Sequence, residues 1–143
     1  MSAATLDPLL DTMGFVRVIE ISDTGRAVLE YEAKSGMCHS GGVVQGGFVT
    51  GWIDAAMANA AIALHGADFT PMTLEIKVSF FAPTRPGTVI AEAWVERHGR
   101  RTTFYEGCLK DSAGTVLAKA SSTILMADRR RVEDAAKAAL AAG

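Results

Sequence analysis

Apolar residues recur at helical spacing near the start of the chain and fill most positions of a longer central segment. The spacing predicts a short helix over Leu6–Met13. The central segment predicts a long helix from Val43 or Gly46 to about Leu64, apolar on most of its sides. An alanine-rich stretch predicts a third helix over Arg129–Ala142.

Elsewhere apolar and polar residues alternate, as they do in half-buried strands. The clearest alternation places Leu74, Ile76, Val78 and Phe80 on one face of a strand. Turn sequences at Ser22–Gly25 and at Asp111–Gly114 predict hairpins between neighbouring segments. The six predicted strands are Phe15–Ile21, Arg26–Lys34, Met72–Ala82, Thr88–Arg97, Thr102–Lys110 and Thr115–Met126.

The order of elements predicts an α+β fold: a helix, two strands, the long helix, and then four strands in a row. Consecutive hairpins give an antiparallel sheet, and the long helix packs on it. The many Ala and Gly residues of this helix let a curved sheet approach closely. A length of 143 residues suits one domain spanning residues 1–143.

Composition narrows the classes of function. A net charge of -2 argues against a nucleic-acid binder. Two cysteines, Cys38 and Cys108, cannot form a disulfide framework, and no ligand spacing suggests zinc or another metal. No leader sequence is visible, so the cytoplasm is the expected location. Polar residues, including Asp54, interrupt the long apolar helix, which favours a buried helix over a membrane span.

The long helix begins with Gly46 and Gly47. The first backbone N–H groups of a helix have no intrahelical acceptor and lie at the positive end of the helix dipole. They can bind an anion, or a carbonyl oxygen that becomes negative during acyl transfer. The alternative is that the glycines only allow close packing or an unusual turn.

Asp54 lies in the middle of this apolar helix, where aspartate is rare without a partner. The residues three and four positions away are Thr50, Gly51, Met57 and Ala58, and none of them is basic. The carboxylate could act as a nucleophile or as a general base for water. Equally, it could accept a hydrogen bond from a neighbouring strand or face solvent.

Gly46 and Asp54 are separated by ~12 Å along one helix, at 1.5 Å per residue. One substrate carbonyl therefore cannot contact both groups of a single chain. A twofold dimer with antiparallel helices would bring Gly46 of one protomer near Asp54 of the other. If both groups act on one substrate, the site lies at a homodimer interface.

Three segments of the chain resemble the hotdog-fold acyl-CoA thioesterases, specifically the PaaI-like branch of the phenylacetate pathway. The first is the loop from His39 to Gly47, followed by Asp54 at the family's spacing from the second glycine. The second runs from Thr73 to Gly87, and the third combines Arg97–Arg100 with Asp111–Ala118. The resemblance implies the hotdog fold, in which a curved antiparallel sheet of about six strands wraps a long central helix.

The resemblance also implies roles for individual residues. Asp54 would attack the thioester or activate water, and the N–H of Gly46, helped by Gly47, would polarise the thioester carbonyl. Thr73 stands where the family has a Ser or Thr that positions the attacking water.

Two positions depart from the family pattern, because His39 stands where the family has Asn and Gln45 where it has His. The Gln45 amide could donate to the thioester or hold the loop. His39 could replace Asn as a donor, or could make activity depend on pH near neutrality.

Coenzyme A carries phosphates that basic side chains bind well. Arg97, His98, Arg100 and Arg101 cluster at one turn and are candidate contacts for these phosphates, although a solvated turn would have the same composition. Phe48 and Met72, with Trp52, Met57 and Phe81, are candidates for the acyl pocket, or else belong to the core.

The expected function is hydrolysis of an acyl-CoA to a free acid and coenzyme A by a homodimer or a dimer of dimers. No cofactor, metal, nucleic acid or membrane is expected to take part. The alternatives are a non-catalytic acyl-CoA binder and, third, a hotdog hydratase or dehydratase. The last usually needs a His beside the acid, and none lies near Asp54 on the helix.

Overall fold

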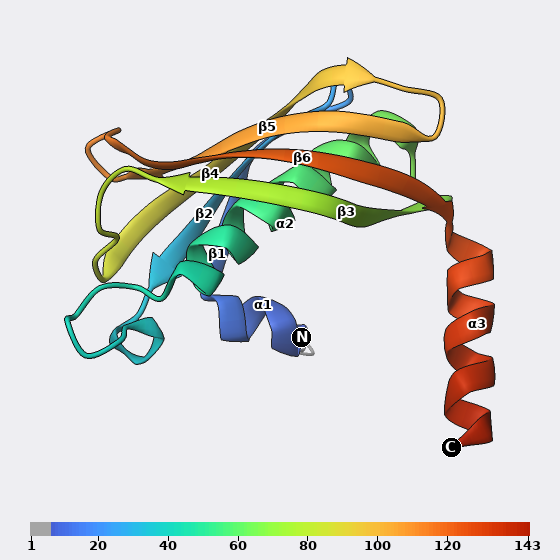
Figure 1. Ribbon diagram of the computed structural model, residues 1–143, viewed down its shortest axis with the longest axis horizontal. Coiled ribbons are helices and arrows are strands. Elements are labelled where there is room, and N and C mark those ends of the chain that lie inside the picture. The colour runs from blue at the N-terminus through green and yellow to red at the C-terminus, as the bar shows by residue number, and fades with distance from the viewer. Residues whose placement is uncertain (1–6) are drawn as a thin grey trace, which may run out of the picture.

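Six strands form one antiparallel sheet within residues 7–143, the part of the chain that the computed structural model describes. The spatial order of the strands is β1-β2-β4-β5-β6-β3, and the long helix α2 lies along one face of the curved sheet (Figure 1). This arrangement confirms the α+β class and the hotdog fold. The strands are β1 (Phe15–Ser22), β2 (Arg26–Ala33), β3 (Phe69–Phe80), β4 (Gly87–His98), β5 (Thr102–Asp111) and β6 (Val116–Asp128).

The helices are α1 (Pro8–Met13), α2 (Gly46–His65) and α3 (Arg129–Ala142), with a 3₁₀ turn, η1, at Ser35–Met37. The helical spacing of apolar residues predicts a start at position 6, which lies outside the described residues, and α1 is described from Pro8. The side chain of Asp7 caps this helix by accepting a hydrogen bond from the Leu9 N–H at 2.9 Å. Proline at the first helical position then costs no hydrogen bond.

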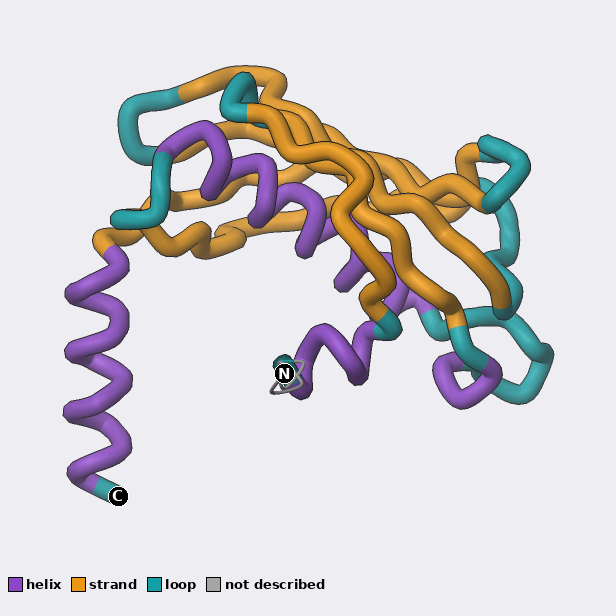
Figure 2. Tube along the Cα trace, turned by 180° about the vertical axis from the view of Figure 1, so that it is seen from behind, coloured by secondary structure: helices purple, strands orange, loops and turns teal. Residues whose placement is uncertain are grey.

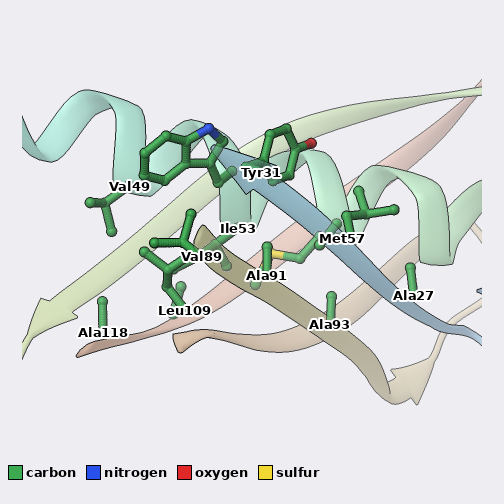
Figure 3. Close-up of a cluster of buried hydrophobic side chains, with 14 of the residues drawn as sticks. Ala27, Tyr31, Val49, Ile53, Met57, Val89, Ala91, Ala93, Leu109 and Ala118 are labelled. Atoms are coloured by element: carbon green, nitrogen blue, oxygen red, sulfur yellow. The ribbon is translucent and has the colours of Figure 1, made fainter. Parts of the chain in front are cut away.

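α2 packs its apolar side against the inner face of the sheet. Figure 3 shows Val49, Ile53 and Met57 of this helix among side chains of the surrounding strands. At Gly107 of β5 a Cβ atom would lie 2.8 Å from the Cγ2 atom of Ile53, so only glycine lets the sheet come this close. By length and composition α2 could also cross a bilayer. Its buried residues are Val49, Trp52, Ile53, Ala56, Met57, Ala60 and Ala61.

β3 lies at one edge of the sheet and pairs only with β6. Phe80 shares the predicted face of the strand with Ile76 and Val78, opposite the buried Ala118. Leu74 does not follow the predicted alternation, and Leu74 and Phe80 are 59% and 54% exposed. An irregularity in the pairing between Thr73 and Glu75 shifts the register of the strand. Of these four residues Ile76 and Val78 pack against the core, since the sheet ends at β3 and no other element within residues 7–143 covers the free edge of the strand.

We expect the two tyrosines to ionise at a higher pH than free tyrosine does. Burial raises the pKa of Tyr31 and of Tyr105 to about 12. In the unfolded chain, both tyrosines would ionise near their ordinary pKa of 10.0. The unfolded state therefore loses protons first, and the free energy of unfolding falls as the pH rises between these two values.

An absorbance titration of tyrosinate, with circular dichroism to monitor folding, measures both pKa values at once, because these are the only tyrosines in the chain. A folded protein whose tyrosines titrate near the ordinary value would contradict this packing.

Candidate active site

The loop before α2 is fixed by backbone hydrogen bonds from two separate parts of the chain. The Gln45 N–H donates to the Met37 carbonyl at 2.9 Å, and the Val44 N–H donates to the Thr84 carbonyl at 2.8 Å. These bonds tie the start of α2 to η1 and to the segment after β3. The position of Gly46, the first residue of the helix, is therefore set by tertiary contacts.

The amides of the two glycines at the start of α2 differ. Gln45 is the N-cap residue, and its Oε1 atom accepts a hydrogen bond from the Gly47 N–H at 2.9 Å. Among the described residues the Gly46 N–H has no acceptor. We expected two bare amides, and the structure leaves one, because the cap uses the Gly47 donor. Gln45 thus holds the helix start, one of the two roles open to it.

A cleft of about 480 Å³ lies beside Gly46. A Cβ atom at Gly46 would lie 3.2 Å from the Cζ atom of Phe80, so glycine leaves room for this ring. The cleft is lined by Val43, Val44, Gly46, Val49, Phe80, Phe81, Ala82, Pro83 and Thr84. Its uncharged lining and the adjacent positive end of the helix dipole suit an apolar group attached to a polarised carbonyl.

Asp54 is half-buried, and its Oδ1 atom accepts a hydrogen bond from the Thr73 hydroxyl of β3 at 2.7 Å. Among the described residues its Oδ2 atom has no donor. The two residues are 19 positions apart in the chain, and the sheet edge brings them together. The hydrogen bond to a neighbouring strand, one of the alternatives for Asp54, is thus present, and one carboxylate oxygen remains available.

Asp54 belongs to a line of residues on α2 that the sheet does not cover. These residues recur at helical spacing and are half-buried or exposed; we call Thr50, Asp54, Ala58 and Ile62 the open stripe of α2. The open stripe adjoins the free edge of β3, as the bond between Asp54 and Thr73 shows. Asp54 does not line the cleft beside Gly46 of the same chain.

His39 lies exposed in the loop before α2. Its Nδ1 atom accepts a hydrogen bond from the Gly41 N–H at 3.3 Å. The neutral ring then carries its proton on Nε2, where it can donate to a ligand. No group of three or more His, Cys, Asp or Glu side chains in residues 7–143 is arranged to hold a metal ion.

The candidates for the acyl pocket separate in the structure. Trp52 and Met57 are fully buried in the core. Phe48 packs on Trp52, with ring centroids 6.2 Å apart, and Met72 is exposed on β3. Of these candidates only Phe81 lines the cleft. Phe80 and the segment after it could not be predicted from the sequence as lining residues, because their approach to Gly46 depends on long-range pairing that no local pattern reveals.

The basic residues Arg97, His98, Arg100 and Arg101 lie in and beside the β4–β5 hairpin, at the far end of α2 from Gly46. The His98 ring packs edge-on against His65, the last residue of α2, with ring centroids 4.6 Å apart. Burial, together with the charge of His98, lowers the pKa of His65. Within one chain these residues are remote from the cleft.

The sequence profile of the thioesterase superfamily matches residues 41–118, a range that holds Gly46, Asp54 and Thr73. This chain belongs to the thioesterase superfamily. A relative from Saccharolobus solfataricus, named as an esterase, is 34% identical over 105 residues, which cover 73% of this chain and 74% of the relative.

Solved structures of the PaaI-like type resemble this thioesterase in fold and sequence. A Ralstonia eutropha protein described as a thioesterase related to phenylacetic acid degradation has a TM-score of 0.77 and 26% identity, covering 85% of this chain and 92% of its own. PaaI of Thermus thermophilus has a TM-score of 0.74 and 25% identity, covering 83% and 98%. A Streptococcus mutans protein solved with acetyl-CoA shares the fold, at 17% identity, a TM-score of 0.73 and coverages of 80% and 89%.

Replacement of Gln45 by Ala should remove the cap of α2 in this thioesterase and lower the free energy of unfolding by about 1 kcal/mol. Asn at the same position is a good cap and is the matched control. Urea denaturation of the three proteins measures the difference. Equal stability of the Ala and Asn variants would contradict a capping role for this side chain.

Proposed function

We propose that this thioesterase hydrolyses acyl-CoA thioesters at a site shared by two protomers. Gly46 of one protomer polarises the thioester carbonyl, and Asp54 of the other supplies the attacking group or activates the attacking water. The observation that carries the proposal is the hydrogen bond between Thr73 of β3 and Asp54, which lies on the open stripe of α2. It leaves a carboxylate oxygen free where a second copy can approach.

In the water-activating route, the free Oδ2 atom of Asp54 accepts a proton as a water oxygen attacks the thioester carbon. The carbonyl oxygen becomes negative and accepts a hydrogen bond from the Gly46 N–H at the positive end of α2. The carbonyl then re-forms as the carbon–sulfur bond breaks, and the leaving thiolate takes up the proton that Asp54 accepted, which restores the carboxylate. Thr73 holds the carboxylate through Oδ1. The route needs only water and the thioester.

The exposed surface beside β3 supports the dimer. Met72, Leu74, Phe80 and Phe81, on and just after β3, are each between 44% and 60% exposed. Large apolar side chains exposed along a free sheet edge are typical of an interaction site. A twofold axis across the edge would cover these side chains and set the two α2 helices antiparallel, as the shared site requires.

The same dimer accounts for the distant basic residues. The rise from Asp54 to the end of α2 at His65 is ~16 Å. If the partner's Asp54 lies beside Gly46, the partner's β4–β5 hairpin lies ~16 Å beyond Gly46. An extended coenzyme A is long enough to span this distance. Arg97, Arg100 and Arg101 of that hairpin would then meet its phosphates. The Streptococcus mutans protein solved with acetyl-CoA supports this ligand class.

Replacement of Asp54 by Asn should lower kcat/KM at least about 100-fold, because the amide cannot accept the proton. Thiol release from acetyl-, octanoyl- and phenylacetyl-CoA measures the rate. Asp23→Asn, the same chemical change in the exposed β1–β2 turn, is the matched control. An unchanged rate for Asp54→Asn would contradict the mechanism, and saturable binding of every ester without thiol release would indicate a non-catalytic binder.

Two inactive variants should complement each other if the site is shared. Gly46→Pro removes the N–H at the first helical position and should cost about 100-fold or more beyond Gly46→Ala, which brings the same Cβ atom toward Phe80 but keeps the N–H. Gln45, which precedes it, already has the extended backbone that proline demands. A heterodimer of Gly46→Pro with Asp54→Asn keeps one intact site.

Co-expression with two different tags isolates this heterodimer, which should regain up to half of the wild-type rate. A heterodimer as inactive as either parent would contradict the shared site.

A further inference from the structure

α3 is a helix of 14 residues with no buried side chain. It extends away from the sheet on the side where α2 lies, and Figure 2 shows its body standing clear of the other elements. It also follows residue 118, the last position that the family profile matches. A helix of about this length is marginal in water on its own. Its body therefore needs a cover that the described part of its own chain does not provide.

One side of α3 is apolar. Val132, Ala136, Ala139 and Leu140 recur at helical spacing, and Leu140 is 83% exposed. Asp134 and Lys137 occupy the opposite side. Near the start of the helix, Arg129 and Glu133 pair with each other at 2.9 Å. Arg129 begins the same side of the helix as Val132, and beyond this first turn the strip is uncharged and can pack on another apolar surface.

The register of β3 and β6 decides where α3 lies in the proposed dimer. Phe69 pairs with Asp128, so α3 begins level with the first residue of β3. Phe80, at the last residue of β3, lies beside Gly46 and the cleft. A twofold axis across β3 places the start of this strand in one protomer beside its end in the other. α3 therefore emerges next to the partner's cleft, on the side of the sheet that carries α2 (Figure 1).

We propose that α3 of each protomer packs its apolar side over the partner's cleft, against Phe80 and Phe81, and forms the outer wall of the acyl site. The cleft can cover the apolar side of α3, because its lining is uncharged and its two phenylalanines are 54% and 60% exposed. The proposal rests on the dimer of the proposed function. It makes α3 a determinant of acyl-chain selectivity, with no part in the chemical step.

Cross-linking between two singly substituted chains tests the contact. Phe81→Cys and Ala136→Cys are made on separate chains in a Cys38→Ser, Cys108→Ala background, co-expressed with different tags and treated with a short bismaleimide. The expected result is a covalent heterodimer. The control replaces Phe81→Cys with Ile19→Cys, which is 42% exposed on β1, at the opposite edge of the sheet, and should give none.

Sedimentation of the same untreated samples separates the two possible failures. A monomer would overturn the shared site of the proposed function, and α3 packing with it. A dimer without the cross-link between positions 81 and 136, or with equal cross-linking to position 19, would overturn only the placement of α3.

The acyl-chain selectivity of the enzyme tests whether α3 is a wall of the acyl site. Leu140→Gln keeps a good helix former but places an amide on the apolar side of α3. We expect the ratio of kcat/KM for octanoyl-CoA over acetyl-CoA to fall about tenfold. Lys137→Gln, on the polar side, is the matched control and should leave the ratio unchanged. A chain ending after Asp128 should behave as Leu140→Gln does. An unchanged ratio in both the Leu140 variant and the shortened chain would overturn the role of α3 as a wall.

Discussion

The incomplete cover of α2 is the constraint on which the rest of this structure depends. A helix apolar on most of its sides needs protein on most of its sides. The sheet covers one side closely, helped by Gly107 against Ile53, but it ends at β3. The open stripe of α2 and the free edge of β3 remain together at the surface. Asp54 and Thr73 face each other across that boundary, so the polar pair sits where the chain's own core stops.

The same boundary separates the two halves of the proposed chemistry. The helix dipole and the unpaired Gly46 amide lie at the start of α2, whereas the carboxylate lies two turns further along. A helix is rigid, so no side-chain movement within one chain can close a distance of ~12 Å. In the proposed dimer, a twofold axis would bring the carboxylate of one protomer to the amide of the other. It would also cover the exposed apolar residues of β3 and the body of α3.

The start of α2 shows how a single side chain limits the chemistry available there. The family pattern has His at position 45, and this chain has Gln. A Gln oxygen caps the helix through the Gly47 amide, which leaves one backbone donor for an oxyanion. Stabilisation of negative charge would then come from the Gly46 N–H, from the dipole behind it, and from whatever the exposed loop around His39 contributes.

The sequence by itself determined the elements, because hydrophobic period and turn chemistry are local. The six strands, the long helix and the position of Asp54 within it could all be predicted. Only the tertiary structure decided which strand lies at the edge, because strand order comes from pairings between distant segments. That order exposes Leu74 and Phe80, brings Thr73 to Asp54, and builds the cleft beside Gly46. Periodicity shows which side of a helix or strand is apolar, but long-range packing decides which surface that side packs against.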